Sequence, residues 1–404
     1  MKLLISAAEA SSDLHASHLV AALRDLDPEI EIRGIGGAQL ERQGLTPLAR
    51  TSDLAVMGSF EVLSRLPQIW RAEKALLSEA RAFRPDVAVL LDYPGFHFRV
   101  GPELKRLGIP VIYMIPPKVW VWRRSRLAAM KAWVKTVLCI LPFEPRLYHE
   151  AGIAAEYIGS PLVEELPMRE TCEQARQKLG LDLTQPVLAV LPGSRPSEMR
   201  RHWEPFLEAA RLFSQRQQSP WQIVVPIAST LEGDGWTERL TLWARERLGP
   251  EGRLHVVREH SGWVLRAADL GLIKSGTSTL EAAALECPMV VAYRPGRFTS
   301  FAVKHVLRYR GPVGLVNLFR GWKSGDALIA PEVLHEQMTA QRLASELHQL
   351  FSNPKRLETM RHDLSALRAE ILGSGGDALL PSARAARAVL RVLEESRLAS
   401  GVSL

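Results

Sequence analysis

The sequence predicts an α/β protein built from two Rossmann-like domains. Short apolar runs with the length of buried strands alternate with segments in which apolar residues recur at helical spacing. This alternation starts at Lys2, pauses near Leu162 and starts again at Val187. With 404 residues, the chain is long enough for two large cores and too long for one ordinary core.

The composition is that of a globular protein, with 47% hydrophobic and 24% charged residues. No apolar run approaches the roughly 18 to 20 residues that a membrane-spanning helix needs. The amino terminus turns polar at Glu9 without a signal-peptide pattern, so we expect a cytoplasmic protein. Cys139, Cys172 and Cys287 have neither metal nor redox spacing, which predicts unpaired thiols and no metal site.

The net charge of +7 suits three kinds of partner: nucleic acid, an anionic membrane or a phosphorylated substrate. No zinc-finger, RNP-type or helix-turn-helix signature is found, so we do not expect nucleic acid as a partner. The second predicted strand, Glu31 to Gly37, ends in glycines that lack the full dinucleotide fingerprint. We therefore expect no nicotinamide cofactor.

The first predicted strand, Lys2 to Ala7, is followed by polar residues. Open parallel sheets bind ligands outside the carboxyl ends of their strands, so Glu9, Ser11 and Asp13 are candidates for ligand contacts. The alternative is that Ser11, Ser12 and Asp13 only cap the helix that follows.

Residues 55 to 77 predict an amphipathic helix whose apolar residues alternate with Arg65, Arg71 and Lys74. The apolar residues are Phe60, Val62, Leu63, Leu66, Ile69 and Trp70. An apolar face with a basic border suits the surface of an anionic bilayer. An internal core helix has the same periodicity and remains the alternative.

The strand Val87 to Leu91 leads into Asp92 and a Pro-Gly turn. A carboxylate at this edge can accept a proton from an attacking hydroxyl group, although it can also be a structural Asp that fixes its own turn. The next strand, Val111 to Ile115, leads into a loop with Lys118, Trp120, Trp122, Arg123 and Arg124. These residues suit a phosphate next to an apolar chain, or else the rings pack on the domain.

In the second half of the chain, the strand Val187 to Leu191 opens into Gly193, Ser194 and Arg195. The guanidinium fork of Arg195 can bind a pyrophosphate, but a solvated loop arginine is the commoner case.

The stretch from Ile273 to Arg294 predicts a strand, a polar turn, a helix and another strand. Ser275, Gly276 and Thr277 form the turn, and Thr277 or Ser278 is the expected N-cap. Such a helix start favours an anion, and the first-turn carboxylate of Glu281 can accept hydrogen bonds from a diol. An ordinary strand-helix-strand unit is the alternative.

Seven motifs, in order along nearly the whole chain, resemble those of the lipid-A-disaccharide synthase family. They are Ala8-Glu9-Ala10-Ser11-Ser12-Asp13, Ala55-Val56-Met57-Gly58, Leu91-Asp92-Tyr93-Pro94-Gly95-Phe96, Val119-Trp120-Val121-Trp122-Arg123, Leu191-Pro192-Gly193-Ser194-Arg195, Ser275-Gly276-Thr277 with Thr279-Leu280-Glu281, and Cys287-Pro288-Met289-Val290-Val291-Ala292-Tyr293-Arg294. The Val-Trp-x-Trp-Arg and Cys-Pro-Met-Val-Val-x-Tyr-Arg runs are the most specific to that family.

The resemblance implies a GT-B fold, in which two Rossmann-like domains face each other across a cleft and the C-terminal helix crosses back to the first domain. We expect an acceptor and membrane-side domain at 1–163, a UDP-sugar domain at 164–355 and returning helices at 356–404. The family works at the cytoplasmic face of the inner membrane as a peripheral protein. A homodimer is compatible with the sequence.

The resemblance also implies an activity, the transfer of 2,3-diacylglucosamine from its UDP derivative to the 6-hydroxyl of 2,3-diacylglucosamine 1-phosphate. The anomeric centre is inverted and UDP leaves, with no metal or cofactor. Asp92 is then the general base, and Arg195 neutralises charge on the leaving UDP. The implied donor-binding residues are Glu9, Ser11, Ser194, Arg195, Ser275, Gly276, Thr277, Glu281 and Asn317.

The sequence departs from the family pattern at several positions. The family usually has Gly at Ala8 and Ser12, His at Ser160, Ser at Pro116 and Lys118, Pro at Val316, and Gln at His335. Since Glu9, Asp92, Arg195, Glu281 and Asn317 match the pattern, we expect an active enzyme. Two alternatives are a related enzyme that uses a soluble UDP-sugar and a non-catalytic paralogue that binds lipid phosphate.

Overall fold

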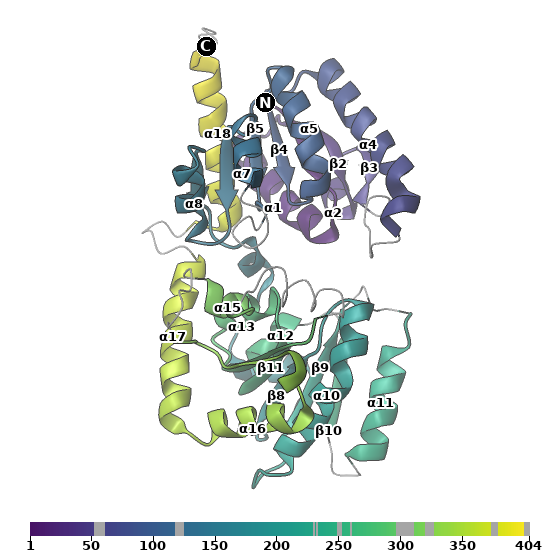
Figure 1. Cartoon of the computed structure of the whole chain (residues 1–404), viewed down its shortest axis with the longest axis vertical. Coiled ribbons are helices and arrows are strands. Elements are labelled where there is room, and N and C mark those ends of the chain that lie inside the picture. The colour runs from purple at the N-terminus through teal and green to yellow at the C-terminus, as the bar shows by residue number, and fades with distance from the viewer. Residues whose placement is uncertain are drawn as a thin grey trace. The chain divides into compact units, whose positions relative to one another are not determined.

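The computed structural model describes residues 1–51, 61–117, 125–228, 231, 233–248, 253–258, 261–295, 311–319, 327–372 and 379–399. Phe60, Lys118, Trp120, Trp122 and Arg123 lie outside these residues. The chain forms two compact units, of which the first combines Met1–Glu164 with Gly373–Leu404 and the second is Glu165–Leu372 (Figure 1). None of the helices in the described ranges is both long and apolar enough to cross a membrane.

The described part of the first unit contains a seven-stranded parallel sheet. Its strands, from edge to edge, are β3 (Pro47–Arg50), β2 (Glu31–Gly36), β1 (Lys2–Ala7), β4 (Val87–Leu91), β5 (Val111–Met114), β6 (Thr136–Cys139) and β7 (Ala155–Tyr157). The helices of this unit are α1 (Ala10–Leu26), α2 (Ala38–Arg42), α4 (Glu61–Phe83), α5 (Pro94–Arg106), α7 (Ser125–Lys131), α8 (Glu144–Glu150) and α18 (Pro381–Ala399).

Alternate residues of the central strands supply two separate apolar layers, one on each face of this sheet. Leu3 and Ile5 of β1 point to the face covered by α1 and α18. Leu4 points to the opposite face, where α4 and α5 contribute side chains such as Leu76 and Phe96. Strands that are apolar on both faces read as continuous apolar runs, which explains why the sequence identified β1 and β4 at their observed bounds.

The last helix, α18, belongs to the first unit although it follows the second unit in the chain. It packs against α1, and its fully buried Ala385 and Val389 join the same apolar layer as Leu19 and Leu23. This arrangement confirms the predicted return of the C-terminal helix (Figure 1). The preceding helix, α17 (Pro354–Leu372), stays in the second unit because it packs against α13 and α16, so the return begins after residue 372 rather than after 355.

The described part of the second unit contains a six-stranded parallel sheet. Its strands, from edge to edge, are β10 (Arg253–Arg258), β9 (Gln222–Ile227), β8 (Val187–Leu191), β11 (Leu270–Lys274), β12 (Met289–Tyr293) and β13 (Glu332–Leu334). Its helices are α9 (Cys172–Lys178), α10 (Pro196–Ser214), α11 (Trp236–Arg247), α12 (Ser261–Ala267), α13 (Ser278–Ala284), α15 (Leu315–Leu318), α16 (Ala340–Phe351) and α17.

The strand order of each sheet reverses at one point. In the first unit the reversal lies between β1 and β4, and in the second it lies between β8 and β11. At such a point, the chain segments that follow the two neighbouring strands run to opposite faces of the sheet. A crevice for a ligand therefore forms at the carboxyl ends of these strands. The fold therefore places one ligand-binding edge in each unit, and both sheets confirm the predicted α/β class.

Candidate functional site

Asp92 follows β4 directly, at the reversal point of the first sheet. Its backbone has a φ of 51°, in the left-handed region, and the φ of Tyr93 is 41°. The main-chain carbonyl of Asp92 accepts hydrogen bonds from Tyr113 Oη at 2.7 Å and from His97 Nδ1 at 2.6 Å. The half-buried Asp92 thus lies on a hydrogen-bonded turn at the edge where open parallel sheets bind their ligands.

Glu9, the N-cap residue of α1, lies on the neighbouring loop at the same edge, after β1. Burial, and then the negative charge of Glu9, raise the pKa of Tyr93 above its ordinary value. The structure therefore brings together Glu9 and the turn that carries Asp92.

The other polar residues after β1 differ in their surroundings. Ser11 is exposed in the first turn of α1, whereas Ser12 is buried and its Oγ has no hydrogen-bond partner in the described part of the chain. Asp13 accepts backbone N–H groups of Gly37 at 2.7 Å and Gln39 at 2.9 Å. Asp13 therefore anchors the start of α2 and does not cap its own helix, whose N-cap residue is Glu9.

In the second unit, the turn Gly193–Arg195 follows β8 at the reversal point of the sheet. Gly193 has a φ of 135°, and a Cβ atom there would lie 2.6 Å from the Cβ of Glu198, so only glycine fits. Ser194 and Arg195 are both exposed, and Arg195 is the N-cap residue of α10. The sequence motif thus gives a tight turn that leaves the Arg195 side chain accessible to solvent.

An ion pair that the sequence did not predict lies next to this turn. Lys274 Nζ, at the end of β11, lies 2.7 Å from Oε1 of Glu198 in the first turn of α10, and each side chain is only 14% exposed. The second oxygen of Glu198 accepts the Ser194 N–H at 3.3 Å. Burial alone would raise the pKa of Glu198, but the charge of Lys274 and its hydrogen bond hold that pKa below the ordinary value. The pair joins the two loops at the reversal point, and a charged residue that ends an apolar strand was the available signal.

The second loop at this point, Ser275–Thr277, lies between β11 and α13. Ser275 Oγ donates to the carbonyl oxygen of Val313 at 2.7 Å. Thr277 is the predicted N-cap residue, but its side chain makes no capping hydrogen bond. A Cβ atom on Gly276 would meet Lys274 Nζ at 3.4 Å, so the ammonium group lies beside this turn.

Glu281 lies in the first turn of α13 and is 8% exposed. Burial raises its pKa to about 7, against the opposite effect of a hydrogen bond with Ser261. Its Oε2 atom has no hydrogen-bond partner among the described residues. A buried carboxylate oxygen without a partner costs free energy, so Glu281 is a candidate to accept a hydrogen bond from a ligand.

Asn317, a predicted donor contact, is held by hydrogen bonds within the second unit. Its side-chain amide donates to the Ala330 carbonyl oxygen at 2.9 Å and to Glu332 at 2.7 Å, and its Oδ1 accepts the Ala330 N–H at 3.0 Å. Glu332 also accepts the N–H of Val313, the residue that binds Ser275. The structure thus shows Asn317 supporting the segment behind Ser275.

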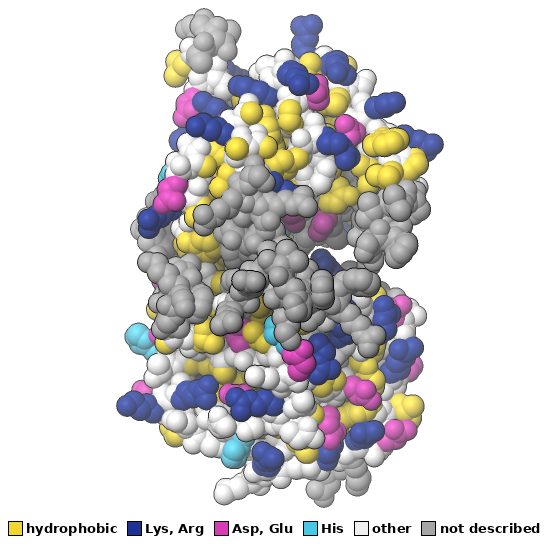
Figure 2. All heavy atoms as spheres, viewed as in Figure 1, with side chains coloured by type: hydrophobic (Ala, Val, Ile, Leu, Met, Phe, Trp, Pro, Cys, Tyr) yellow, Lys and Arg dark blue, Asp and Glu magenta, His cyan; other side chains and the backbone are white. Residues whose placement is uncertain are grey.

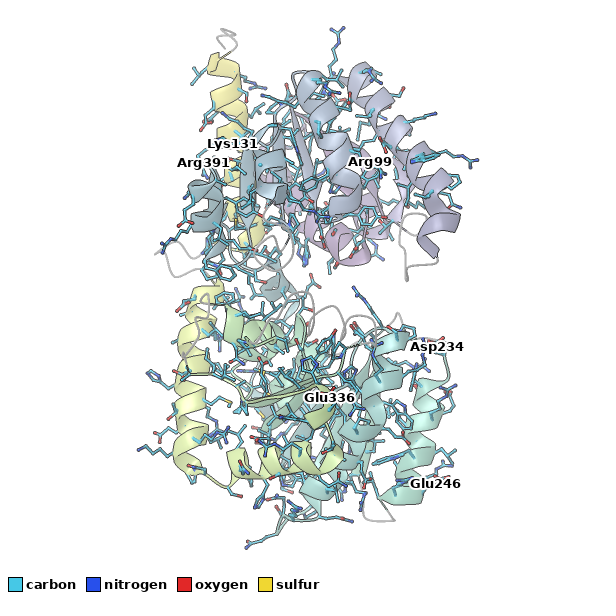
Figure 3. The ribbon with its side chains drawn as sticks, in the orientation of Figure 1. Arg99, Lys131, Asp234, Glu246, Glu336 and Arg391 are labelled. Atoms are coloured by element: carbon cyan, nitrogen blue, oxygen red, sulfur yellow. The ribbon has the colours of Figure 1, made fainter. Side chains whose placement is uncertain are left out.

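The predicted membrane face lies on α4, which an ion pair between Glu73 and Arg99 of α5 ties to its neighbour at 2.9 Å (Figure 3). Ile69 is 6% exposed and belongs to the core, so its assignment to the membrane face is wrong. Trp70 is 57% exposed and Leu66 is half-buried. Figure 2 shows hydrophobic side chains close to Lys and Arg side chains over this part of the first unit. The side chains of Val62 and Leu63 lie outside the described structure.

The sequence is similar to those of a known protein family. The sequence profile described as lipid-A-disaccharide synthetase matches residues 3–377. The lipid-A-disaccharide synthase of Myxococcus xanthus (strain DK1622) is 38% identical over 397 residues, which cover 98% of this chain and 99% of that protein.

Two solved structures have a similar fold. A UDP-GlcNAc 2-epimerase from Neisseria meningitidis, bound to UDP-GlcNAc, has a TM-score of 0.60 at 12% identity and covers 98% of this chain and 100% of its own. A glycosyltransferase from Rickettsia africae ESF-5 has a TM-score of 0.56 at 12% identity and covers 98% of both chains. At such identity the likeness concerns the fold alone, and it confirms the predicted pair of Rossmann-like domains.

Proposed function

The chain belongs to the lipid-A-disaccharide synthetase family, and on this premise we propose that it joins UDP-2,3-diacylglucosamine to 2,3-diacylglucosamine 1-phosphate. Membership makes it a glycosyltransferase of lipid A biosynthesis. The finer proposal is a β-1,6 bond, formed with inversion at the anomeric carbon and release of UDP. The observation that carries this proposal is the set of polar groups at the reversal point of each sheet. The first unit has the carboxylate of Asp92 there, and the second has two turns suited to phosphate, Gly193–Arg195 and Ser275–Thr277.

We assign the general base to Asp92. Its carboxylate accepts the proton of the acceptor 6-hydroxyl while that oxygen attacks the anomeric carbon and the bond from this carbon to the UDP oxygen breaks. The half-buried position of Asp92 at the carboxyl edge of the sheet supports this role.

We assign most of the donor binding to the second unit. Glu281 accepts the ribose hydroxyl groups, which would satisfy its buried oxygen. Arg195, with Ser194 and the turn of Ser275, Gly276 and Thr277, faces the diphosphate and neutralises charge on the departing UDP. The Neisseria epimerase, solved with UDP-GlcNAc, supports a UDP-sugar as a ligand of this fold. Glu9 and Ser11 of the first unit remain proposed contacts of the donor. Asn317 supports the segment that binds Ser275.

We assign the membrane surface to the α4 side of the first unit, because both proposed substrates carry acyl chains. Exposed Trp70 next to exposed Arg71 and Lys74 suits the interface of an anionic bilayer. The protein would then be peripheral on the cytoplasmic face of the inner membrane.

An assay of purified protein with three substrate sets tests the function. We expect UDP release only when acylated donor and acylated acceptor are both present, with a disaccharide as product. Release or sugar conversion with unacylated UDP-N-acetylglucosamine alone would instead indicate an enzyme of soluble UDP-sugars. Binding of the lipid phosphate without any turnover would indicate a non-catalytic paralogue.

The variant Asp92→Asn tests the general base. We expect kcat to fall by about 100-fold or more with UDP affinity nearly unchanged, because the amide cannot accept the proton. Asp25→Asn, at an exposed carboxylate on α1, is the matched control and should keep normal turnover. Near-normal turnover of Asp92→Asn would remove this residue from the role of base.

A further inference from the structure

We propose that His97 and Tyr113 are positioning residues for catalysis, because together they fix the backbone that carries Asp92. The inference rests on the proposed role of Asp92 as general base. Both side chains donate to one atom, the main-chain carbonyl oxygen of Asp92, at 2.6 Å from His97 Nδ1 and 2.7 Å from Tyr113 Oη.

The conformation that they hold is an unusual one. Asp92 and Tyr93 are successive non-glycine residues with φ values of 51° and 41°. A single Asp tolerates the left-handed region, but two successive side chains there are strained unless the surroundings determine them. The Asp92 carbonyl oxygen lies in the peptide between these two residues, so its direction sets ψ of Asp92 and limits φ of Tyr93. A fixed carbonyl therefore restrains the backbone from which the Asp92 side chain extends.

The protonation of His97 follows from its contacts. Nδ1 faces a carbonyl oxygen, which only accepts, so Nδ1 carries the proton. Nε2 then accepts from the hydroxyl group of Ser6 at 2.9 Å. Burial lowers the pKa of His97 to about 4, so the ring is neutral near pH 7 and keeps this one tautomer.

The three donors stand on rigid parts of the fold. Ser6 of β1 pairs in register with Leu90 of β4, and Leu90 pairs with Tyr113 of β5. Ser6, His97 and Tyr113 are each 0% exposed. The rings of His97 and Tyr113 meet edge to face, with centroids 5.8 Å apart. Two donors, one from α5 and one from β5, thus meet at the carbonyl of Asp92, and Ser6 of β1 holds the ring of the first donor, His97.

Three variants test the proposal. Tyr113→Phe removes one hydrogen bond without changing the ring volume, and His97→Leu removes the other. His97→Asn keeps an N–H donor at the δ position but loses the contact with Ser6 and the ring contact with Tyr113. Misplacing a catalytic group by about an ångström can lower the rate by about 100-fold. For Tyr113→Phe and His97→Leu we expect kcat to fall by about tenfold or more, with KM for both substrates and UDP affinity unchanged, and we expect His97→Asn to recover most of kcat.

The matched control is Tyr148→Phe. Tyr148 is also fully buried in the first unit, but its hydroxyl group donates to the Pro117 carbonyl oxygen at 3.3 Å. This variant should lose stability to a similar extent and keep kcat. If Tyr113→Phe and His97→Leu lose no more kcat than Tyr148→Phe while Asp92→Asn is inactive, the positioning role is overturned and the base is retained. An inactive wild-type protein, or an active Asp92→Asn, would overturn the proposed chemistry and this inference with it.

Discussion

At the scale of single residues, the donor-binding role that we propose for Glu281 conflicts with the stability of the fold. The residue is 8% exposed, and burial raises the pKa of its carboxyl group to about 7 from an ordinary 4.5. The folded protein therefore holds a proton between about pH 4.5 and 7 that the unfolded chain has released. The free energy of unfolding is therefore highest below about pH 4.5 and falls as the pH rises to about 7. The total loss is about 1.4 kcal/mol for each unit by which the pKa differs between the folded and unfolded states. A residue that lowers the stability of the fold in this way is typical of a functional site.

The variant Glu281→Gln tests this conflict. The neutral amide removes the cost of ionisation, so Tm at pH 8 should rise relative to wild type, while the two proteins should differ little at pH 4.5. UDP affinity should fall by about tenfold because the amide is a weaker acceptor for the ribose hydroxyls. Thermal melts and calorimetric titrations at both pH values measure these effects. A variant with lower Tm at pH 8 and unchanged UDP affinity would contradict the assignment.

At the scale of elements, the sequence predicted the inner strands well and missed the short strands β3, β7 and β13. All three lie at sheet edges. The residues of β3 and β7 are half-exposed or exposed, so they lack the continuous apolar run that identifies β4 or β8. An edge strand is defined by its neighbour, and that neighbour is distant in sequence.

In the candidate site, too, some residues could be predicted from the sequence and others could not. Asp92 and Ser275 became candidates because polar residues directly after buried strands are visible in the sequence, and Arg195 because it lies in the glycine turn that follows β8. The roles of Asp13 and Asn317 depend on partners that are 24 and 13 residues away, respectively, such as Gly37 and Ala330, so no local pattern reveals them. Ile69 illustrates a further limit, because apolar periodicity marks an apolar helix face without showing what covers it.

The ion pair between Lys274 and Glu198 joins β11 to α10, and its removal should affect both stability and donor binding. Lys274→Met leaves a buried carboxylate without its partner, which should lower the free energy of unfolding by about 3 kcal/mol and weaken UDP binding. The double variant with Glu198→Gln should recover part of both losses. The control is Arg146→Met at an exposed ion pair with Glu150, where we expect a change of about 0.5 kcal/mol or less. Chemical denaturation and UDP titration supply the measurements, and strictly additive single effects would show that the pair is not coupled.

The exposed part of α4 should bind membranes through Trp70. We expect Trp70→Glu to reduce co-sedimentation with anionic vesicles by about tenfold or more without lowering Tm, since a charge there opposes insertion and meets the negative surface. Leu242→Glu on α11 is the control, because Leu242 is also 57% exposed but lies in the second unit. Equal loss of binding in both variants would indicate a general charge effect, and a lower Tm for Trp70→Glu would show that Trp70 contributes to packing.

At the scale of the whole molecule, the chain completes its first core with its last helix, while the second core closes without it. Val389 of α18 is fully buried in the layer shared with α1, so Val389→Asp places an unpaired charge in the first core only. Since each unit has its own sheet and core, we expect calorimetry to show one transition moved to lower temperature by about 10 °C or more and one nearly unchanged. UDP binding, which we assign to the second unit, should persist while turnover is lost. Leu398→Asp, at a side chain that is 82% exposed on the same helix, should change neither transition. A single transition that shifts as a whole would instead mean that the two units unfold as one cooperative body.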